Sequence, residues 1–232
     1  MSGKLDVVDQ FLPLGTAQNA VLQTPAIGLP ERHAGMAATE AAARAAPLQF
    51  DVVVLGNGPA GLATALSLCR TAPALRVAVA APKASDDPRI GESASPAIEP
   101  LLRQLGVLDQ FIAQTHRPAF NAAAAKGSLQ PLANEFFFNP HQHAWRLDRP
   151  KFDRMLADAA HDAGAAMLPG RFTEATMGDD ERWHLSIETR LGPRPLQAGF
   201  VVDATGHRAA FAAQAGVRPV AHDALVGAVR FF

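Results

Sequence analysis

The sequence contains a single cysteine, Cys69, among its 232 residues. One cysteine excludes a disulfide framework within the chain and a four-cysteine metal site. Sparse cysteine is typical of the reducing cytosol. The sequence also has no apolar run long enough to cross a bilayer and no signal-peptide pattern at its start. We therefore expect a cytoplasmic protein that does not engage membranes.

An excess of either charge is also missing. The chain has 21 Lys and Arg residues and 22 Asp and Glu residues, which gives a formal net charge of −1. No global basic field is present to attract nucleic acid. Hydrophobic residues make up 48% of the chain and charged residues 19%, proportions of a globular protein rather than a disordered one.

Residues 1–47 differ from the rest of the chain. They mix Pro, Gly, Ala and Gln without a sustained period, although 36–46 could form a helix with Glu40 and Arg44 spaced for an ion pair. We expect an extension that is disordered or loosely packed, followed by a folded unit over residues 48–232.

The strongest local pattern begins at residue 52, where V-V-V-L forms an apolar run typical of a strand buried on both faces. G-N-G-P-A-G follows, and residues 59–70 then have a helical pattern. A second buried strand is predicted over residues 75–80. Strand, glycine turn, helix and strand indicate a βαβ unit in a parallel sheet.

Gly56, Gly58 and Gly61 have the spacing G-x-G-x-x-G in this context. In such a turn the first glycine permits the tight bend and the second lets a pyrophosphate approach the backbone. The third lets the helix pack closely on the strand. Free N–H groups at the helix N-terminus then face the phosphates. The pattern favours a dinucleotide site over a turn without a ligand.

Further elements are predicted from periodicity and breakers. The expected helices cover residues 97–105, 149–163 with Pro150 in the first turn, and the stretch from Gly206 to Gln214. The expected strands cover 166–176, 183–189 and 200–204, and G-P-R-P at 192–195 is expected to break the chain.

Four stretches in order resemble the N-terminal part of FAD-dependent oxidoreductases of the tryptophan halogenase-like and flavin monooxygenase family. They are D-V-V-V-L-G-N-G-P-A-G-L-A-T-A-L-S-L-C from residue 51, P-R-I-G-E-S-A-S-P-A-I-E-P-L-L-R-Q-L-G-V from 88, A-W-R-L-D-R-P-K-F-D-R-M-L-A-D-A-A-H-D-A-G-A from 144, and F-V-V-D-A-T-G-H-R-A-A-F-A from 200. The resemblance covers residues 50–229. It implies an α/β fold: a Rossmann-like, FAD-binding parallel sheet with part of a β-rich substrate domain, truncated.

The resemblance also implies which residues bind FAD. Those around the pyrophosphate would be Gly56, Gly58, Pro59, Ala60 and Gly61, and those along the ribityl chain and ring Gly91, Glu92 and Ser93. Arg149 would reach the cofactor from the start of its helix, and the turn beside the adenine-side phosphates would be Asp203, Ala204, Thr205 and Gly206. The residues alone leave other interpretations open: Glu92 as an exposed carboxylate, Arg149 paired with Asp148 or Asp153, and Asp203 bonded only to the turn after it.

Three departures from the family pattern bear on function. First, the acidic residue that normally ends the second strand and binds the adenosine ribose is replaced by Ala81, with Asp86 or Asp87 as weak substitutes. Losing a charged acceptor is expected to lower FAD affinity by about 1.5–3 kcal/mol.

Second, the lysine of tryptophan halogenases aligns with Asn121, and Lys126 is out of register. This ranks hydroxylation or related oxidation above halogenation.

Third, the chain ends at V-G-A-V-R-F-F, where the family continues with a substrate sheet and a G-D motif. We therefore expect the C-terminal half of the family fold to be absent, and activity of this chain alone to be in question.

Other candidate residues have simpler interpretations. His141 and His143 form H-x-H without a third ligand, so we expect loop residues and no metal site. Cys69 is expected to pack as a small apolar side chain. E-F-F-F at 135–138 could line an aromatic pocket, but a core strand is favoured.

The sequence thus predicts a flavin-dependent monooxygenase-like oxidoreductase acting on an electron-rich aromatic small molecule or peptide. Tryptophan is one candidate, in the maturation of a protein-derived quinone cofactor. A flavin reductase is a candidate partner. The alternatives are a flavin-dependent halogenase, a non-catalytic truncated flavoprotein or partner subunit, and an alkene reductase resembling geranylgeranyl reductases. No side chain is assigned as catalytic.

Overall fold

The computed structural model describes residues 46–83, 93–124, 132–136 and 139–218, together with residues 220, 222, 226 and 228. The expectations for the extension before residue 46, for Asp86, Asp87, Gly91 and Glu92, and for Lys126 lie outside the described residues.

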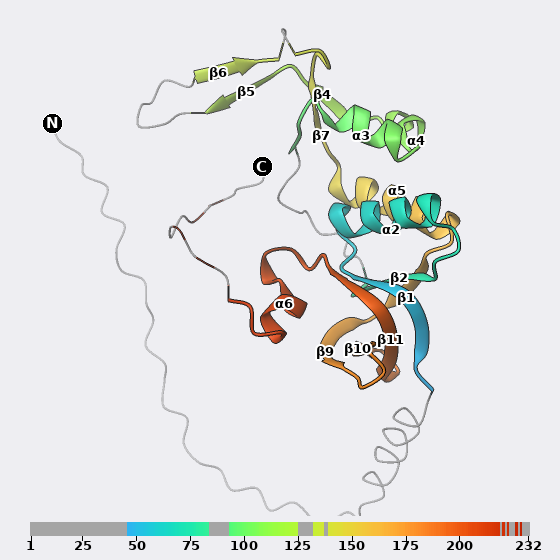
Figure 1. Ribbon diagram of the computed structural model, residues 1–232. Coiled ribbons are helices and arrows are strands. Elements are labelled where there is room, and N and C mark those ends of the chain that lie inside the picture. The colour runs from blue at the N-terminus through green and yellow to red at the C-terminus, as the bar shows by residue number, and fades with distance from the viewer. Residues whose placement is uncertain are drawn as a thin grey trace, which may run out of the picture.

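The chain combines helices with a main sheet that is mostly parallel, as in an α/β fold (Figure 1). The elements are β1 (Leu48–Leu55), α2 (Pro59–Thr71), β2 (Val77–Ala81), β3 (Ser93–Ala94), α3 (Ile98–Gln104), α4 (Leu108–Ala113), β4 (Arg117–Ala119), β5 (Asn121–Ala124), β6 (Leu132–Glu135), β7 (Ala144–Arg146), α5 (Arg149–Asp162), β8 (Ala166–Pro169), β9 (Arg171–Met177), β10 (Trp183–Thr189), β11 (Gly192–Asp203), a short 3-10 helix η1 (Gly206–Arg208) and α6 (Ala210–Gln214).

The main sheet has the strand order β8-β2-β1-β11-β10-β9. β8, β2, β1 and β11 run parallel, and β10 and β9 continue the sheet antiparallel. Leu55 of β1 lies opposite Ala80 of β2 and Asp203 of β11. Three parallel strands therefore end at one level, and this confirms the predicted βαβ unit and its parallel sheet.

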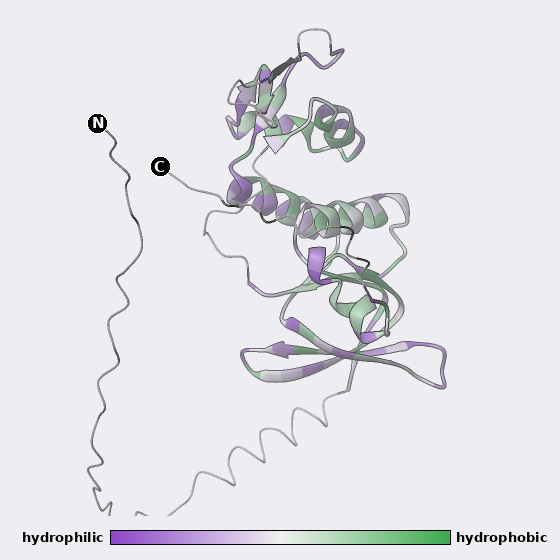
Figure 2. Ribbon diagram, turned by 90° about the vertical axis from the view of Figure 1, so that its left-hand side faces the viewer, coloured by the Kyte–Doolittle hydropathy of each residue, from purple (hydrophilic) through white to green (hydrophobic). Residues whose placement is uncertain are grey.

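Two helices, α2 and α5, pack side by side over one face of the parallel strands (Figures 1 and 2). Val52 and Val54 of β1 point into this layer. The predicted apolar stripe of α5 is buried there, through Phe152, Met155, Leu156, Ala159 and Ala160. Cys69 is also buried in this core, as expected for a packed apolar side chain.

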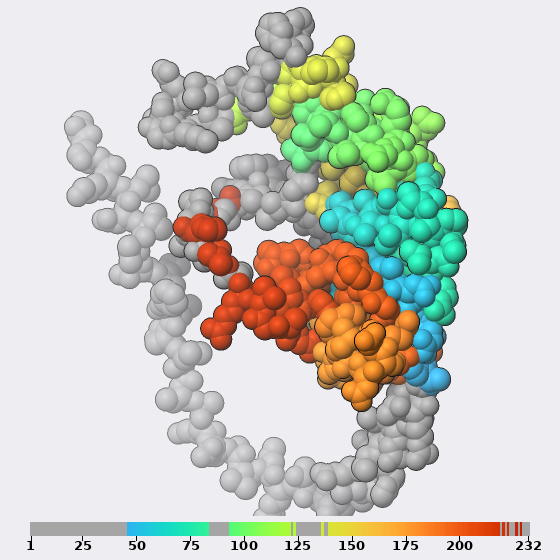
Figure 3. Space-filling model, viewed as in Figure 1, coloured from blue at the N-terminus to red at the C-terminus, as the bar shows by residue number. Residues whose placement is uncertain are grey.

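The opposite face of the sheet is covered by the sheet itself. Val53 and Leu55 of β1 share a second core with Leu185 and Ile187 of β10. The antiparallel strands β10 and β9 therefore curl under the parallel ones (Figure 2). α6 closes one end of this layer, where the Phe211 ring lies 4.8 Å from the Trp183 ring and 6.2 Å from the Phe172 ring (Figure 3).

A smaller unit lies on the side of the main sheet that α2 and α5 cover (Figure 1). It contains the sheet β3-β7-β4, the hairpin β5-β6 and helices α3 and α4. Phe111 of α4 is fully buried, and its ring makes edge contacts with Trp145 at 5.2 Å and Phe152 at 5.8 Å. These aromatic contacts join the smaller unit to α5.

Two sequence predictions about strands are wrong. Residues 166–176 form two strands, because the chain turns at Gly170, where an added Cβ would lie 2.8 Å from Ile187 Cδ1. G-P-R-P at 192–195 does not break the chain but begins β11. β1 starts at Leu48, opposite Leu196, so both prolines precede the part of β11 that lies between two strands, and an edge position tolerates proline.

The tight contact at the end of β1 predicts a large stability effect. Gly56 has φ +119°, and a Cβ there would lie 2.3 Å from the Ala204 carbonyl oxygen. We expect Gly56→Ala to destabilise the fold by about 3 kcal/mol or more, because positive φ and a backbone clash add together. Urea unfolding of the variant measures this.

Gly58→Ala is the matched control. Gly58 has φ −79° and its Cβ would meet no atom of the described residues within 4 Å, so the same change there should leave the unfolding free energy within about 0.5 kcal/mol. Equal destabilisation by both variants would contradict the assignment of Gly56 to a packing role.

Candidate FAD-binding site

Gly56 and Gly61 are required by the packing of the turn between β1 and α2. A Cβ on Gly61 would lie 2.1 Å from the Gly56 carbonyl oxygen and 3.1 Å from Ala204 Cβ. Together with the contact of Gly56 with Ala204, this brings the start of α2 against the end of β11. The fold alone accounts for glycine at these two positions.

Gly58 is different, because no contact among the described residues requires glycine there. Its φ of −79° and ψ of 176° suit any residue, and no atom of the described residues lies within 4 Å of its ideal Cβ position. The space beside this residue is therefore open to another molecule. A glycine that keeps such space free lets a pyrophosphate approach the backbone.

The first turn of α2 is suited to an anion. Gly58 is its N-cap, with no side-chain hydrogen bond to the cap, and the first turn holds Pro59 and no acidic residue. The helix dipole and the N–H groups at its start therefore favour a negative group bound from outside. The space beside Gly58 and the positive end of the α2 dipole therefore fit the pyrophosphate of FAD.

Asn57 fixes the glycine turn to the neighbouring strand. Its Nδ2 donates to the Pro82 carbonyl oxygen at 3.1 Å, just after β2. The Gly56 N–H donates to the Ala80 oxygen at 2.9 Å, and the Ala204 N–H to the Leu55 oxygen at 2.9 Å. Sequence reasoning missed Asn57, although an amide side chain between two glycines of a turn is a readable signal.

The end of β2 lacks the expected carboxylate, as the sequence indicates. Ala81 is buried, with 6% of its surface exposed, and its carbonyl oxygen accepts from the Gly170 N–H at 2.9 Å. An apolar side chain at this position offers no acceptor to a ribose hydroxyl.

Asp203 organises the turn after β11. Its Oδ1 accepts from the Thr205 hydroxyl at 2.6 Å and the Thr205 N–H at 3.1 Å, and its Oδ2 accepts from Phe211 and Ala212 N–H, both at 3.0 Å. Burial acts to raise its pKa, but the hydrogen bonds from Thr205, Ala212 and Phe211 outweigh it and hold the pKa below the ordinary value.

The carboxylate of Asp203 therefore holds its own turn and the start of α6, which was the simpler of the two interpretations. Gly206, with φ +71°, continues this turn. Because Ala204 touches Gly56, the two turns lie side by side, so the structure brings together the residues predicted around the pyrophosphate and those predicted beside it.

Arg149 begins α5 and is held by its own helix. Its Nε lies 3.2 Å from Asp153 Oδ1 and its Nη2 lies 3.2 Å from Asp153 Oδ2. The Arg149 side chain is 14% exposed and that of Asp153 6%, so this is a well-buried ion pair. Of the two local partners considered, Asp153 is the one, since Asp148 instead caps the helix by accepting from the Lys151 N–H at 3.2 Å.

Buried His116 fixes the first turn of α5, and sequence reasoning missed it. Its Nδ1 accepts from the Asp148 N–H at 3.2 Å, so Nε2 carries the proton and donates to Gln114 Oε1 at 3.0 Å. Gln114 Nε2 in turn donates to the Lys151 oxygen at 3.2 Å. Burial lowers the pKa of His116, opposed by the Asp148 carboxylate and reinforced by Lys151.

Ala60 and Ser93 are the remaining described residues of the predicted set, and Ala60 is exposed in the first turn of α2. Ser93 begins β3 in the smaller sheet, opposite Arg146 of β7, and its side chain is exposed. Gly91 and Glu92 lie outside the described residues. The role predicted for this segment stays a prediction.

The histidines of the H-x-H stretch do not form part of a metal cluster among the described residues. In the described ranges, no three His, Cys, Asp or Glu side chains are grouped to hold a metal ion. His143 lies 4.0 Å from Glu99, and its ring packs 4.8 Å from that of Trp145. No helix in the described part of the chain is long and apolar enough to span a membrane.

Comparison with known proteins defines the class. Residues 49–230 match a family described as FAD binding domain. This covers well over half of the 232-residue chain. The protein therefore belongs to the FAD binding domain family.

Relatives and solved structures extend this assignment. LodB of Marinomonas mediterranea, whose name describes an FAD-dependent oxidoreductase, is 29% identical over 184 residues, 78% of this chain and 50% of that protein. The 1H-pyrrole-2-carbonyl-[peptidyl-carrier protein] chlorinase of Pseudomonas fluorescens is 28% identical, over 73% of this chain and 42% of that protein. The flavin-dependent halogenase CmlS has 26% identity and a TM-score of 0.65, over 73% of this chain and 31% of its own.

Monooxygenases share the fold at lower identity. The p-nitrophenol 4-monooxygenase PnpA of Pseudomonas putida has 20% identity and a TM-score of 0.62, over 73% of this chain and 44% of its own. The chain thus spans about half the length, or less, of these proteins. Proteins similar to this chain in sequence thus include an FAD-dependent oxidoreductase and flavin-dependent halogenases, and a monooxygenase shares its fold.

The open space at Gly58 predicts a separation of binding from stability. Gly58→Val should fill that space, weaken FAD binding about tenfold or more, and leave the unfolding midpoint nearly unchanged. Quenching of flavin fluorescence during titration measures the affinity. Ser67→Val, on an exposed position of α2, is the control and should bind FAD as the parent does. Unaltered affinity of Gly58→Val would contradict the site.

His116 predicts a dependence of stability on pH. Because the pKa of His116 is lowered in the folded chain, its imidazole takes up a proton below about pH 6.5 in the unfolded chain but only at lower pH in the folded chain. This contribution to stability is complete above pH 6.5 and decreases as the pH falls toward the folded-state pKa.

His116→Asn should keep an acceptor near the Nδ1 position, cost about 1–3 kcal/mol at pH 7.5 through lost ring packing, and flatten the pH slope. Thermal melts from pH 7.5 to 5 test this. His161→Asn, at an exposed position of α5, should keep the parent slope. An unchanged slope in His116→Asn would contradict the assignment.

Proposed function

We propose that this chain is the FAD-binding part of a flavin-dependent monooxygenase-like oxidoreductase that oxidises an electron-rich aromatic substrate. The substrate class includes tryptophan, free or in a peptide, and the maturation of a tryptophan-derived quinone cofactor is one setting for such a reaction. A separate flavin reductase is a proposed partner, and the cytoplasm is the proposed location.

The observation that carries the proposal is the open space at Gly58. Gly56 and Gly61 are explained by contacts within the protein, but Gly58 is not, and it lies at the uncapped start of α2. A pyrophosphate that approaches the backbone at this point explains why residue 58 is glycine. Membership of the FAD binding domain family identifies FAD as the dinucleotide.

The protein's part in this chemistry is to hold and orient the cofactor. The first turn of α2 would hold the pyrophosphate, and the Asp203 turn would support it from the side through the contact of Ala204 with Gly56. Arg149, fixed by Asp153 and by the His116 contact with Asp148, would reach the cofactor from the start of α5. Reduced FAD supplies the activation of dioxygen when bound.

Halogenation is the second candidate. The chlorinase and CmlS among the similar proteins favour it. The alignment that places Asn121 at the halogenase lysine disfavours it, and Asn121 lies in β5 with an exposed side chain. A non-catalytic truncated flavoprotein or partner subunit is the third candidate, favoured by Ala81 at the end of β2.

One experiment separates these candidates. The FAD-loaded chain is photoreduced without air and then mixed with tryptophan in buffer that contains ¹⁸O₂ and bromide. Oxidation predicts a product that carries one labelled oxygen atom, detected by mass spectrometry. A brominated product would favour the halogenase. Retained FAD with neither product, also with a tryptophan-containing peptide, would contradict both and favour the non-catalytic alternative.

A further inference from the structure

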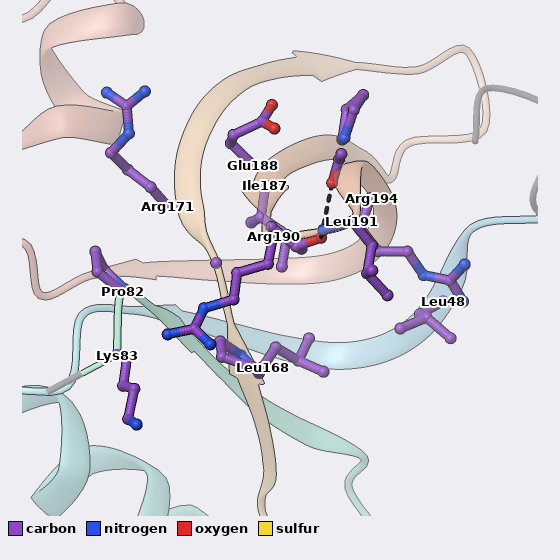
Figure 4. Close-up of a pocket in the computed structure, with 15 residues that line it drawn as sticks. Leu48, Pro82, Lys83, Leu168, Arg171, Ile187, Glu188, Arg190, Leu191 and Arg194 are labelled. Carbon is purple, nitrogen blue, oxygen red and sulfur yellow. Dashed lines mark hydrogen bonds between the residues drawn. The ribbon is translucent and has the colours of Figure 1, made fainter. Parts of the chain in front are cut away.

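A large cavity opens on the face of the sheet opposite α2 and α5. Its volume is about 1170 Å³, at the upper end of what small-molecule sites require. It lies between the ends of β2 and β8 on one side and the β10–β11 hairpin on the other (Figure 4). Leu48, Leu168 and Ile187 line it and belong to the second core or pack against it.

This position separates the cavity from the glycine turn. The first turn of α2 belongs to the helix layer, whereas the apolar lining of the cavity belongs to the layer under the sheet. Leu48 begins β1 and Gly58 follows its end, so the cavity reaches toward the opposite end of that strand. Pro82, which follows β2, lines the cavity and also accepts the hydrogen bond from Asn57 of the glycine turn.

Positive charge gathers around this apolar lining. Four cations line the cavity, Lys83, Arg171, Arg190 and Arg194, against one carboxylate, Glu188. Within the described residues, none of the four cations has an ion pair or a side-chain hydrogen bond. Figure 4 shows Arg190 reaching toward Leu168 and Arg194 lying beside Leu48. Unpaired cations beside apolar surface attract a molecule with an anionic head and an apolar body.

The hairpin that presents two of these cations is fixed by its own hydrogen bonds. The Thr189 hydroxyl donates to the Gly192 oxygen at 2.8 Å and accepts from the Leu191 N–H at 3.1 Å. Leu191, at the tip, is 95% exposed. Arg190 and Arg194 therefore flank a defined turn rather than a long loop.

We propose that this cavity is a second binding site, distinct from the flavin site, for an organic anion with an aromatic or aliphatic body. Arg190 and Arg194 bind the anionic group, and Leu48, Leu168 and Ile187 contact the apolar body. The site is independent of the proposed oxidation, so it can be tested whether or not the chain is a working flavoprotein.

The test uses a matched pair of probes. 8-Anilinonaphthalene-1-sulfonate carries an anionic group on an aromatic body, and N-phenyl-1-naphthylamine has a closely similar body without the charge. Fluorescence titration of the chain should show one saturable site for the sulfonate, with affinity at least about tenfold higher than for the amine, because charge-assisted contacts are lost with the sulfonate. Added salt should lower the affinity for the sulfonate and leave the affinity for the amine unchanged.

The double variant Arg190→Gln and Arg194→Gln should lower sulfonate affinity about tenfold and leave the amine unchanged. The control, Arg103→Gln with Arg218→Gln, removes the same charge from two exposed positions outside the cavity and should bind as the parent does. An equal loss in both double variants would contradict the site, as would binding that does not saturate. Thermal melts confirm that each variant is folded.

ADP, the colourless half of FAD, distinguishes the two sites. Excess ADP should leave sulfonate binding unchanged, and calorimetry should give the same sulfonate affinity with FAD present. Displacement of the sulfonate by ADP would overturn the proposal and assign the cavity to the adenosine end of the flavin. Failure to bind FAD at all would contradict the proposed function but not this site.

Discussion

The close approach of two backbones, at Gly56 and Ala204, is the contact on which the rest of the site depends. It leaves no room for a Cβ at Gly56 and brings the ends of β1 and β11 together. The Gly61 contact with the Gly56 oxygen then draws the start of α2 onto the same point. Once these contacts form, the first turn of α2 and the Asp203 turn must face the same edge of the sheet. The anion-binding geometry is thus a consequence of backbone packing, with little side-chain chemistry involved.

A second set of contacts fixes the neighbouring helix. Arg149 at the start of α5 is paired with buried Asp153, with 14% and 6% of the two side chains exposed. The buried ring of His116 and the amide of Gln114 hold the same turn at Asp148 and Lys151. Since α5 packs along α2, this network sets where Arg149 lies relative to the glycine turn. It also links the smaller unit, from which His116 and Phe111 come, to the helix layer.

Local patterns predicted the elements whose causes are local. The β1–α2–β2 unit and the apolar stripe of α5 were predicted because buried strands, glycine spacing and helical period are each visible in a short window. The strand break at G-P-R-P was wrong because tolerance of proline depends on which strands flank β11. The turn at Gly170 was missed because the two strands on either side of it pair with different partners, β2 and β10, which lie far apart along the chain. For the same reason the G-x-G-x-x-G spacing identified Gly58 as a candidate, but the sequence could not show that packing in the fold leaves the glycine at this position unexplained. Nor could it show that His116 supports α5, or that four cations surround a cavity.

The most direct test of the account is hydrogen exchange at the glycine turn, followed by mass spectrometry with FAD or with riboflavin, which has the ring but no pyrophosphate. If the first turn of α2 holds the pyrophosphate, FAD will slow exchange of the amides over residues 56–64, and riboflavin will not. Equal protection by both molecules, or protection by FAD only elsewhere in the chain, would contradict the assignment of the open space at Gly58 to the cofactor.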